Sequence, residues 1–418
     1  MGAPAAERLF TLATSILGAR PPVRLRAWDG SQAGDKGAPT LVVRDKRALR
    51  RLVWQRGELG FANAYILGEI DIEGDLIAAL SRTWQWLDEQ NKPRRKSWQV
   101  LRTALALKVL GPAPAPPQMS AQPTGALHSK KRDQQVIAHH YDFSNEFYEL
   151  ILDSSMAYSC AYWTCDDPTY GLAQAQFDKL DLICRKLGLR PGMRMLDVGC
   201  GWSGLAIHAA KNFGVQVTGI TLSEAQRGFG EKRVAEAGLA DRITVRLQDY
   251  RDLDDEPYDA VASIEMGEHV GAAQYPTYLS ALHRSLRPRG RLLLQQMSRH
   301  DDAPGGGPFI ETYIAPDMHM RPVGETVSLV EAAGLEVRDV HALREHYVHT
   351  ARAWLKNLDT HEAAACDMVG DANVRLWRLY LAGGALAFAQ NRMGVDQILA
   401  VRPTKTGETG MPEARRCA

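Results

Sequence analysis

The segment MRMLDVGCGWSG, residues 193–204, decides the fold that this chain adopts. Its first part, RMLDV, is an apolar run typical of a buried strand, and Asp197 lies at the end of that strand. Gly199 and Gly201 follow, and glycine permits both a tight turn and the close approach of a ligand to the backbone. The next residues, 202–214, have the spacing of a helix and end in glycine. The segment therefore predicts a strand, a glycine-rich turn and a helix in succession.

The same alternation of strand and helix continues toward the C-terminus. Residues 224–238 have a helical pattern, and further strand-like segments lie at 215–223, 243–250, 258–271 and 290–298. Alternating strands and helices indicate an open, mostly parallel sheet with helices on both faces, which is a doubly wound, Rossmann-like α/β fold. In such a sheet, ligands bind at the carboxyl ends of the strands. We therefore expect the functional site at that edge.

The chain is predicted to contain a second, smaller domain before this sheet. Residues 1–110 mix strand-like runs such as PTLVVRD with helical runs such as DLIAALSRTWQWLDEQ, which indicates a mixed α/β N-terminal domain. Residues 111–132 are rich in proline, alanine and polar residues, as in a flexible linker, and residues 133–418 form the second domain. The linker ends in Lys130, Lys131 and Arg132. This basic cluster fits a solvated helix start or a contact with anionic lipid headgroups.

Composition narrows the class of protein. The 418 residues are 45% hydrophobic with a net charge of +1, so no strong overall field favours a nucleic-acid partner. We find no apolar run of about 18 residues, so no membrane-spanning helix is predicted. The six cysteines are scattered without a C-x-x-C pair. That pattern suits the reducing cytoplasm and argues against a disulfide framework or a zinc site.

The glycine-rich loop favours one cofactor over another. A G-x-G turn also occurs in NAD and FAD sites. Here, however, bulky Trp202 lies where a pyrophosphate needs open backbone amides, and Asp197 would repel phosphate while attracting an ammonium group. Both features fit S-adenosylmethionine, which carries an amino acid and a sulfonium. The acidic residue that usually follows the second strand is absent, and Thr221, Ser223 and Gln226 offer hydroxyl and amide groups to the ribose instead.

Several runs of residues together resemble one family. They are HHYDFSNEFYELILDSSMAYSCAYW (139–163), LDVGCGWSG (196–204), GITLSEAQ (219–226) with RLQDYRDL (246–253), and IEMGEHVG (264–271). In order and spacing they resemble the cyclopropane-fatty-acyl-phospholipid synthase and mycolic acid methyltransferase family, across about residues 130–400. The N-terminal segments DGSQAG and GEIDIEGDLIAAL resemble the phospholipid-acting members. The resemblance implies a Rossmann-like, S-adenosylmethionine-dependent methyltransferase.

The resemblance also implies a reaction and a base. Members of the family transfer the methyl group of S-adenosylmethionine to a cis double bond of a lipid acyl chain, here expected to be an oleoyl chain of a membrane phospholipid. A bound bicarbonate then removes a proton. Its site is expected to include Cys160, Glu268 and Tyr347, with Gln295 where the family has histidine. The structural alternatives are a small buried residue for Cys160, a helix-start carboxylate for Glu268 and a core tyrosine for Tyr347.

The same resemblance implies the residues that contact the cofactor. They are Tyr141, Tyr158, Ser159, Asp197, Gly199, Gly201, Thr221, Leu222, Ser223, Gln226, Gln248, Asp249 and Ile264.

Gln295 bears on the expected product. Histidine can titrate near neutral pH, whereas glutamine cannot, so the base is expected to differ in position or basicity. We therefore favour a methylene-branched chain such as 10-methylenestearoyl, as made by the actinobacterial relatives of the 10-methylstearate type. If Gln295 is a neutral substitution, the product is a cyclopropane instead. A separate flavin-dependent reductase is the expected partner for the methylene product.

The sequence also bears on where the protein works and on two other possible functions. The enzyme is expected in the cytoplasm, peripheral at the inner face of the membrane, with its oligomeric state left open, a homo-oligomer included. A NAD-dependent oxidoreductase is disfavoured by the residues around the glycine-rich loop. A lipid-binding or regulatory protein with an inactive methyltransferase fold is disfavoured because Cys160 and Glu268 are both present.

Overall fold

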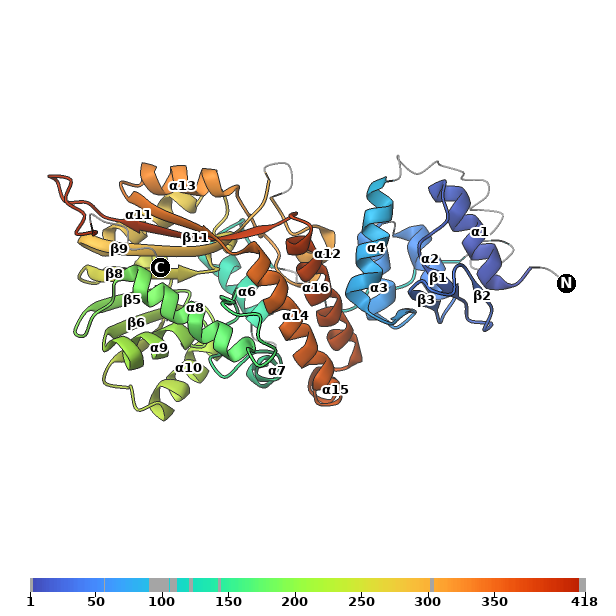
Figure 1. Ribbon diagram of the computed structural model, residues 1–418, viewed down its shortest axis with the longest axis horizontal. Helices are drawn as coiled ribbons and strands as arrows, with labels where there is room; N and C mark the ends of the chain where they lie inside the picture. Colours follow the sequence, from blue (N-terminus) through green and yellow to red (C-terminus); the bar gives the residue numbers. More distant parts are fainter. Residues whose placement is uncertain are drawn as a thin grey trace. The chain divides into compact units, whose positions relative to one another are not determined.

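The computed structural model describes residues 3–55, 57–89, 105, 111–119, 123–141, 144–300 and 304–412. The chain folds as two compact units whose elements are labelled in Figure 1. The first comprises Met1–Ser120 and Glu362–Leu386, and the second comprises Ala121–His361 and Ala387–Ala418. The division after Ser120 falls inside the predicted linker. Residues 362–386 differ from the prediction, because they belong to the first unit rather than to the second.

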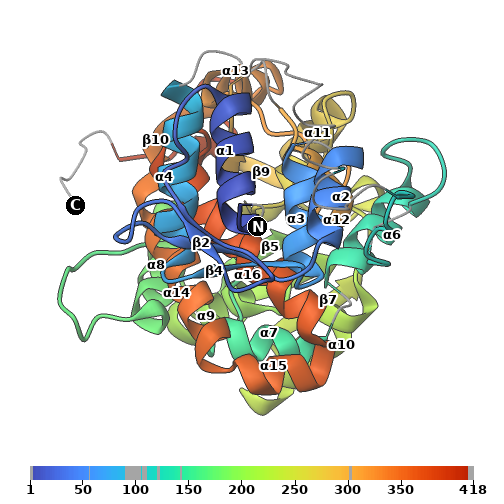
Figure 2. The ribbon, with the colours of Figure 1, turned by 90° about the vertical axis from the view of Figure 1, so that its right-hand side faces the viewer.

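The first unit is a small mixed sheet with helices (Figure 2). Its strands have the order β2-β1-β3-β4, in which β1 and β3 are parallel and the other pairs antiparallel. The strands are β1 (Arg24–Arg26), β2 (Gln32–Ala33), β3 (Thr40–Val43) and β4 (Ile70–Glu73). The helices are α1 (Ala5–Leu17), α2 (Arg47–Trp54), α3 (Glu58–Ile66), α4 (Leu76–Glu89), α15 (Glu362–Val369) and α16 (Asp371–Ala389).

Two arginines, one buried and one partly buried, stabilise this unit. Arg51 of α2 forms a bidentate ion pair with Glu69, and both side chains are only 4% exposed. Arg375 of α16 donates to the backbone carbonyls of Tyr65 and Ile70. Its guanidinium also lies 4.2 Å from the centre of the Tyr65 ring. These long-range contacts explain why residues 362–386 join the first unit.

The second unit contains the predicted open sheet. Its strand order is β10-β11-β9-β8-β5-β6-β7, and β5 to β9 are parallel, whereas β11 is antiparallel to both neighbours. The strands are β5 (Arg194–Val198), β6 (Gln216–Thr221), β7 (Ile243–Leu247), β8 (Tyr258–Ile264), β9 (Leu286–Ser298), β10 (Glu336–Ala342) and β11 (Gly394–Val401). The mostly parallel Rossmann-like sheet is thus confirmed. Strands β10 and β11 were not predicted from the sequence patterns.

The second unit has four further helices and two short turns among its described residues. They are α6 (Lys130–Tyr141), α7 (Asn145–Ile151), α12 (Pro308–Tyr313) and α14 (Arg344–Thr360), with 3-10 turns η1 (Tyr250–Asp252) and η2 (Gly267–His269).

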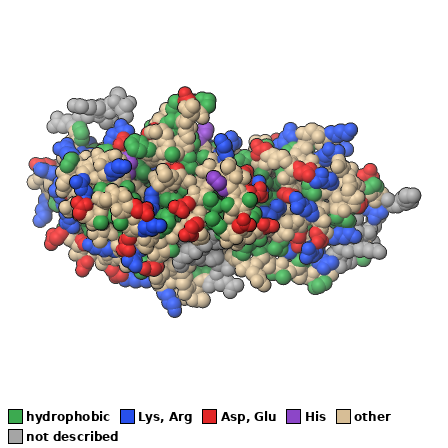
Figure 3. All heavy atoms as spheres, turned by 90° about the horizontal axis from the view of Figure 1, so that it is seen from below, with side chains coloured by type: hydrophobic (Ala, Val, Ile, Leu, Met, Phe, Trp, Pro, Cys, Tyr) green, Lys and Arg blue, Asp and Glu red, His purple; other side chains and the backbone are tan. Residues whose placement is uncertain are grey.

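The basic cluster at the start of α6 is partly neutralised by ion pairs. Lys130 pairs with Asp252, and Arg132 forms a bidentate pair with Asp317. On the face shown in Figure 3, Lys and Arg side chains are interspersed with Asp and Glu. The ion pairs favour the reading of this cluster as a helix start. Within the described part of the chain, no helix has both the length and the apolar character to cross a bilayer.

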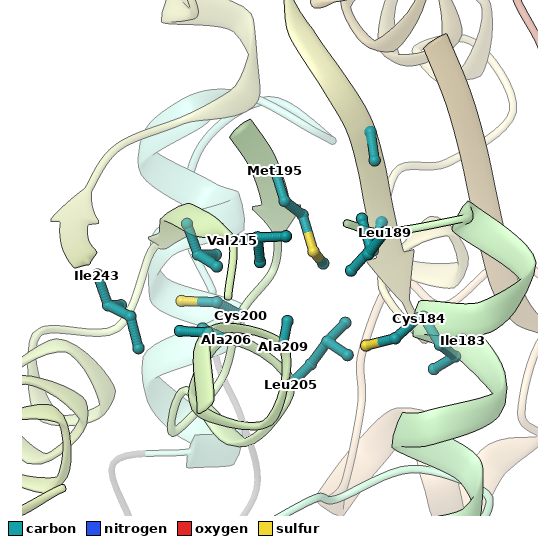
Figure 4. Close-up of a cluster of buried hydrophobic side chains, with 14 of the residues drawn as sticks. Ile183, Cys184, Leu189, Met195, Cys200, Leu205, Ala206, Ala209, Val215 and Ile243 are labelled. Atoms are coloured by element: carbon teal, nitrogen blue, oxygen red, sulfur yellow. The ribbon is translucent and has the colours of Figure 1, made fainter. Parts of the chain in front are cut away.

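Helices cover both faces of the large sheet. On one face lie α8 (Leu172–Leu187), α9 (Gly204–Phe213) and α10 (Glu224–Glu236), and on the other lie α11 (Tyr275–Arg284) and α13 (Val323–Ala332). Because side chains alternate along a strand, Met195 packs toward the first set and Leu196 toward the second. Figure 4 shows Met195 with Leu205 and Ala209 of α9. Each such buried aliphatic side chain contributes about 1.5–3 kcal/mol.

Strand β5 marks the point where the strand order reverses. Its neighbours are β6 on one side and β8 on the other. The glycine-rich loop follows β5 directly, and α9 begins after it and ends at Gly214, which has a φ of 69°. A switch point of this kind leaves a crevice at the carboxyl ends of the strands, where ligands bind.

Candidate active site

A pocket lies beyond the carboxyl ends of β5, β6, β7 and β8. Most of the predicted cofactor residues line it, namely Tyr158, Ser159, Asp197, Gly199, Gly201, Thr221, Leu222, Gln226, Gln248 and Ile264. Ser223 and Asp249 do not line it. Tyr141 ends α6, and its side chain lies outside the described residues. The pocket thus brings together residues from segments spread over about 100 positions of the chain.

Ser223 and Asp249 instead cap helical turns. The Ser223 hydroxyl accepts a hydrogen bond from the backbone N–H of Gln226 at 3.1 Å, at the start of α10. Asp249 accepts a hydrogen bond from the backbone N–H of Arg251 at 2.9 Å, and it also forms an ion pair with the Arg251 guanidinium. Both residues therefore shape loops beside the pocket rather than its wall.

The glycines of the loop meet a geometric requirement. Gly199 has a φ of 80° and Gly201 a φ of 52°, a backbone region that other residues adopt at a cost. A Cβ on Gly199 would also lie 3.0 Å from Cγ of Met266. The turn is therefore specific for glycine, and it leaves backbone atoms open to the pocket.

Two buried charges face the same pocket. Asp197 has one carboxylate oxygen without a hydrogen-bond partner among the described residues, and burial raises its pKa to about 7. Lys179 of α8 is 1% exposed and donates to the Ser159 hydroxyl at 2.8 Å. Lys179 was not predicted from the sequence, although a lysine among the apolar residues of a helix is a signal. An unpartnered carboxylate fits the cationic amino group of S-adenosylmethionine.

Protonation of Asp197 is expected to control cofactor affinity. A cationic amino group favours the ionised carboxylate, so binding lowers a pKa that is about 7 in the free protein. Affinity for S-adenosylhomocysteine should therefore be full above about pH 7 and fall about tenfold per unit below it. Asp197→Asn should weaken binding about 10–100-fold at pH 8 and remove the pH dependence. Calorimetric titration with S-adenosylhomocysteine from pH 6 to 8 measures the affinity and its pH dependence. Asp241→Asn, at an exposed position, is the control. An unchanged pH profile in Asp197→Asn would contradict this role.

Glu265 gathers three of the predicted catalytic residues around one carboxylate. Its Oε1 accepts from the backbone N–H of Cys160 at 2.8 Å and from the Gln295 amide at 2.9 Å. Its Oε2 accepts from the Tyr347 hydroxyl at 2.6 Å. Burial raises the pKa of Glu265, and these hydrogen bonds oppose the rise. Glu265 lines the pocket, whereas Cys160, Gln295 and Tyr347 lie behind it.

Glu268, which was predicted to help hold bicarbonate, lies outside the cluster around Glu265. It is 1% exposed, and its Oε1 accepts from the backbone N–H of Met297 at 2.5 Å. Burial, with a smaller effect from the charge of Glu265, raises its pKa to about 8. Glu268 does not line the pocket. Glu265 was not predicted as a site residue, although it directly follows strand β8, at the edge of the sheet where ligands bind.

The side chains of the two neighbouring glutamines of β9 lie on opposite faces of the sheet. Gln295 donates to Glu265 and accepts from the Gln397 amide at 2.9 Å. Gln296 accepts from the Tyr275 hydroxyl at 2.6 Å. A Cβ at Gly267 would lie 2.3 Å from the Gln296 oxygen, so this glycine makes room for Gln296. Only the first glutamine of the pair therefore belongs to the site.

Comparison with known proteins identifies the family. Residues 128–398 match the family model described as mycolic acid cyclopropane synthetase. The chain belongs to the mycolic acid cyclopropane synthetase family. The match covers most of the second unit and includes the pocket and the residues around Glu265.

This chain is similar to several known proteins, and the similarity covers different shares of its length. The probable fatty acid methyltransferase Rv3720 of Mycobacterium tuberculosis is 38% identical over 94% of this chain and 93% of its own. The tuberculostearic acid methyltransferase UfaA1 of the same organism is 31% identical over 91% and 88%. The solved structure of mycolic acid cyclopropane synthase CmaA1, complexed with SAH and CTAB, is 32% identical, with a TM-score of 0.60 over 64% and 97%. The fold is that of S-adenosylmethionine-dependent methyltransferases.

Three of the four residues expected to hold bicarbonate in this chain are already bonded to another anion. The Cys160 amide, the Gln295 amide and the Tyr347 hydroxyl all donate to the Glu265 carboxylate. The Cys160 thiol donates to backbone carbonyls of Ala161 and Leu343, and burial raises its pKa. A carboxylate of the chain itself thus takes the place that the resemblance gives to a bound ion.

Proposed function

We propose that this chain methylates the cis double bond of an oleoyl or similar acyl chain of a membrane phospholipid and leaves a methylene branch. The observation that carries the proposal is the pocket in which an unpartnered carboxylate, Asp197, lies near the buried Glu265 cluster. S-adenosylmethionine, when bound, supplies an electrophilic methyl group. Asp197 and Lys179 suit its amino acid end, and Thr221, Gln226 and Gln248 offer polar groups to its nucleoside.

The environment of the pocket suits attack by a weak nucleophile. An alkene competes poorly with water for an electrophile, so the site has to exclude water. Tyr158 lines the pocket and packs against the rings of Tyr148 and Trp354. Ile137, Leu180 and Val270 add further apolar lining. These side chains give part of the pocket wall an apolar character.

Two features favour the methylene branch over a cyclopropane. The relatives that match nearly the whole chain are described as fatty acid methyltransferases, one of them for tuberculostearic acid. Gln295, unlike histidine, cannot take up a proton. The cyclopropane product is the alternative, and the name of the matching family supports it. Because an exocyclic methylene is still an alkene, a flavin-dependent reductase is the class of enzyme that would saturate it.

Deuterium at both alkene carbons of the acyl chain separates the two products. Formation of a methylene branch needs a hydride shift, so both deuterons should end on the carbon next to the branch. A cyclopropane would keep one deuteron on each of the two ring carbons that come from the alkene. We expect the first pattern by mass spectrometry and NMR of lipids from cells that express the chain and are fed the labelled oleate. The ring pattern would establish the alternative, and unmodified oleate would overturn the proposed function.

Separation of the same extract by lipid class tests the substrate. The label should appear first in intact phospholipids rather than in free fatty acids. Such a substrate requires the enzyme to work peripherally at the inner membrane face. The apolar pocket and the basic residues at the start of α6, of which Lys131 is exposed, are consistent with this location.

A further inference from the structure

The most unusual group in the pocket is the carboxylate of Glu265. A carboxylate is costly to bury without partners, and three donors from separate segments compensate for that cost here. The donors are the Cys160 amide, the Gln295 side chain and the Tyr347 hydroxyl. They come from the loop after α7, from β9 and from α14. The fold thus holds one carboxylate in a fixed orientation at the wall of the pocket.

The backbone at Glu265 indicates that its position matters. Its φ of 51° lies in the left-handed region, which is uncommon for residues other than glycine, asparagine and aspartate. Such conformations cost about 1–3 kcal/mol and cluster at functional sites. The conformation is held by a backbone hydrogen bond from the Glu265 N–H to the Gln295 carbonyl at 2.6 Å. The chain therefore accepts local strain at the residue that carries the carboxylate into the pocket.

Three hydrogen bonds fix the orientation of the Gln295 side-chain amide. Its oxygen accepts from Gln397, and its nitrogen donates to both Glu265 and the Cys160 carbonyl, at 2.9 and 3.2 Å. The amide cannot flip without losing all three bonds. A fixed amide N–H always donates to the carboxylate and never competes with it for a proton. Glutamine at this position therefore suits a carboxylate base, whereas a titrating side chain would share the proton.

We propose that the Glu265 carboxylate is itself the base that removes a proton from the methylated acyl chain, without bound bicarbonate. This inference rests on the proposed function. The π electrons of the alkene form the new carbon–carbon bond to the methyl group of S-adenosylmethionine. The carbon–sulfur bond breaks, its electron pair stays on the sulfur of the leaving S-adenosylhomocysteine, and the neighbouring alkene carbon becomes cationic. After the hydride shift, a C–H bond of the new methyl group breaks. Its electron pair forms the exocyclic double bond, and the proton goes to a Glu265 oxygen, from which water removes it after product release.

Two substitutions separate the base from the architecture. Glu265→Gln keeps the shape of the side chain and removes its basicity. General-base catalysis contributes about 10²–10⁴-fold, so activity should fall by that factor while S-adenosylhomocysteine still binds. Glu265→Gly also removes the base, and the suitability of glycine for the positive φ offsets part of the cost of leaving three donors without their acceptor. The vacated space is bordered by the same three donors, so added formate or bicarbonate should restore part of the activity in this variant alone.

The assay uses the full chain with vesicles of oleoyl phospholipid, in buffer purged of carbon dioxide and then supplemented with bicarbonate. We expect wild-type activity to be the same in both buffers. Wild-type activity that requires bicarbonate would overturn the proposal, as would full activity of Glu265→Gln. Loss of activity in Glu268→Gln but not in Glu265→Gln would assign the base to Glu268 instead. A wild-type chain that modifies no acyl lipid would overturn the proposed function and this inference with it.

Discussion

Replacing Glu69 with alanine is expected to destabilise the first unit by about 3–5 kcal/mol. The substitution leaves the guanidinium of Arg51 buried, with the Ala115 carbonyl as its remaining hydrogen-bond acceptor, at 2.8 Å. A buried charge that loses its counterion costs far more than the pair contributes, because no water replaces the lost partner. Urea titration followed by circular dichroism should show an earlier transition, and the loss should be independent of cofactor.

Two further variants test the physical reason. Glu73 forms an ion pair with Arg26 in the same sheet, but its side chain is 51% exposed. Glu73→Ala should therefore change stability by about 1 kcal/mol or less. The double variant Arg51→Met with Glu69→Leu removes both charges and should recover much of the lost stability. Equal effects of Glu69→Ala and Glu73→Ala would show that the burial of the first pair is unimportant.

The sheet could be predicted because its signals are local. Strands β5 to β9 alternate with helices in the sequence, and each has an apolar run and a turn beside it. Strand β11 pairs with β9, which lies about 100 residues earlier, and its antiparallel direction has no local signal. The position of residues 362–386 depends on contacts of Arg375 with residues more than 300 positions away. Such long-range pairings exceed what periodicity can indicate.

Some residues of the candidate site also have a local sequence signal, whereas others do not. Positions in the cofactor loops could be predicted because the turn itself needs Gly199 and Gly201. The resemblance assigned Glu268 to the bicarbonate site, but one turn of irregular backbone decides which carboxylate enters the pocket. The positive φ of Glu265 carries that residue inward, while Glu268 binds the backbone of Met297. No spacing rule distinguishes two acids three positions apart in a turn that is not a regular helix or strand.

Replacing Lys179 with methionine is expected to move the acidic limb of the pH–activity profile to higher pH. The groups that interact electrostatically with this buried lysine are Asp153, Cys160, Asp197, His208 and Glu265. Its charge lowers the pKa values of Asp197 and Glu265, which burial raises. Without that charge both pKa values rise further, and a smaller fraction of each carboxylate is ionised at neutral pH. Each unit of upward shift reduces that fraction about tenfold below the pKa.

Activity of Lys179→Met at pH 7 should therefore fall about tenfold or more for each carboxylate involved, and part of the loss should be recovered as the pH is raised. The recovery is the decisive observation, because a merely misfolded or badly packed variant would stay inactive at every pH. Methionine is close in length to lysine and apolar, so it can occupy the same buried space. Exposed Lys211→Met on α9 is the matched control and should leave the profile unchanged. A profile of Lys179→Met that is lowered equally at all pH values would mean that the lysine acts through packing and its bond to Ser159. A shifted limb would instead assign it the task of keeping two buried carboxylates ionised, one for the cofactor and one for the proton.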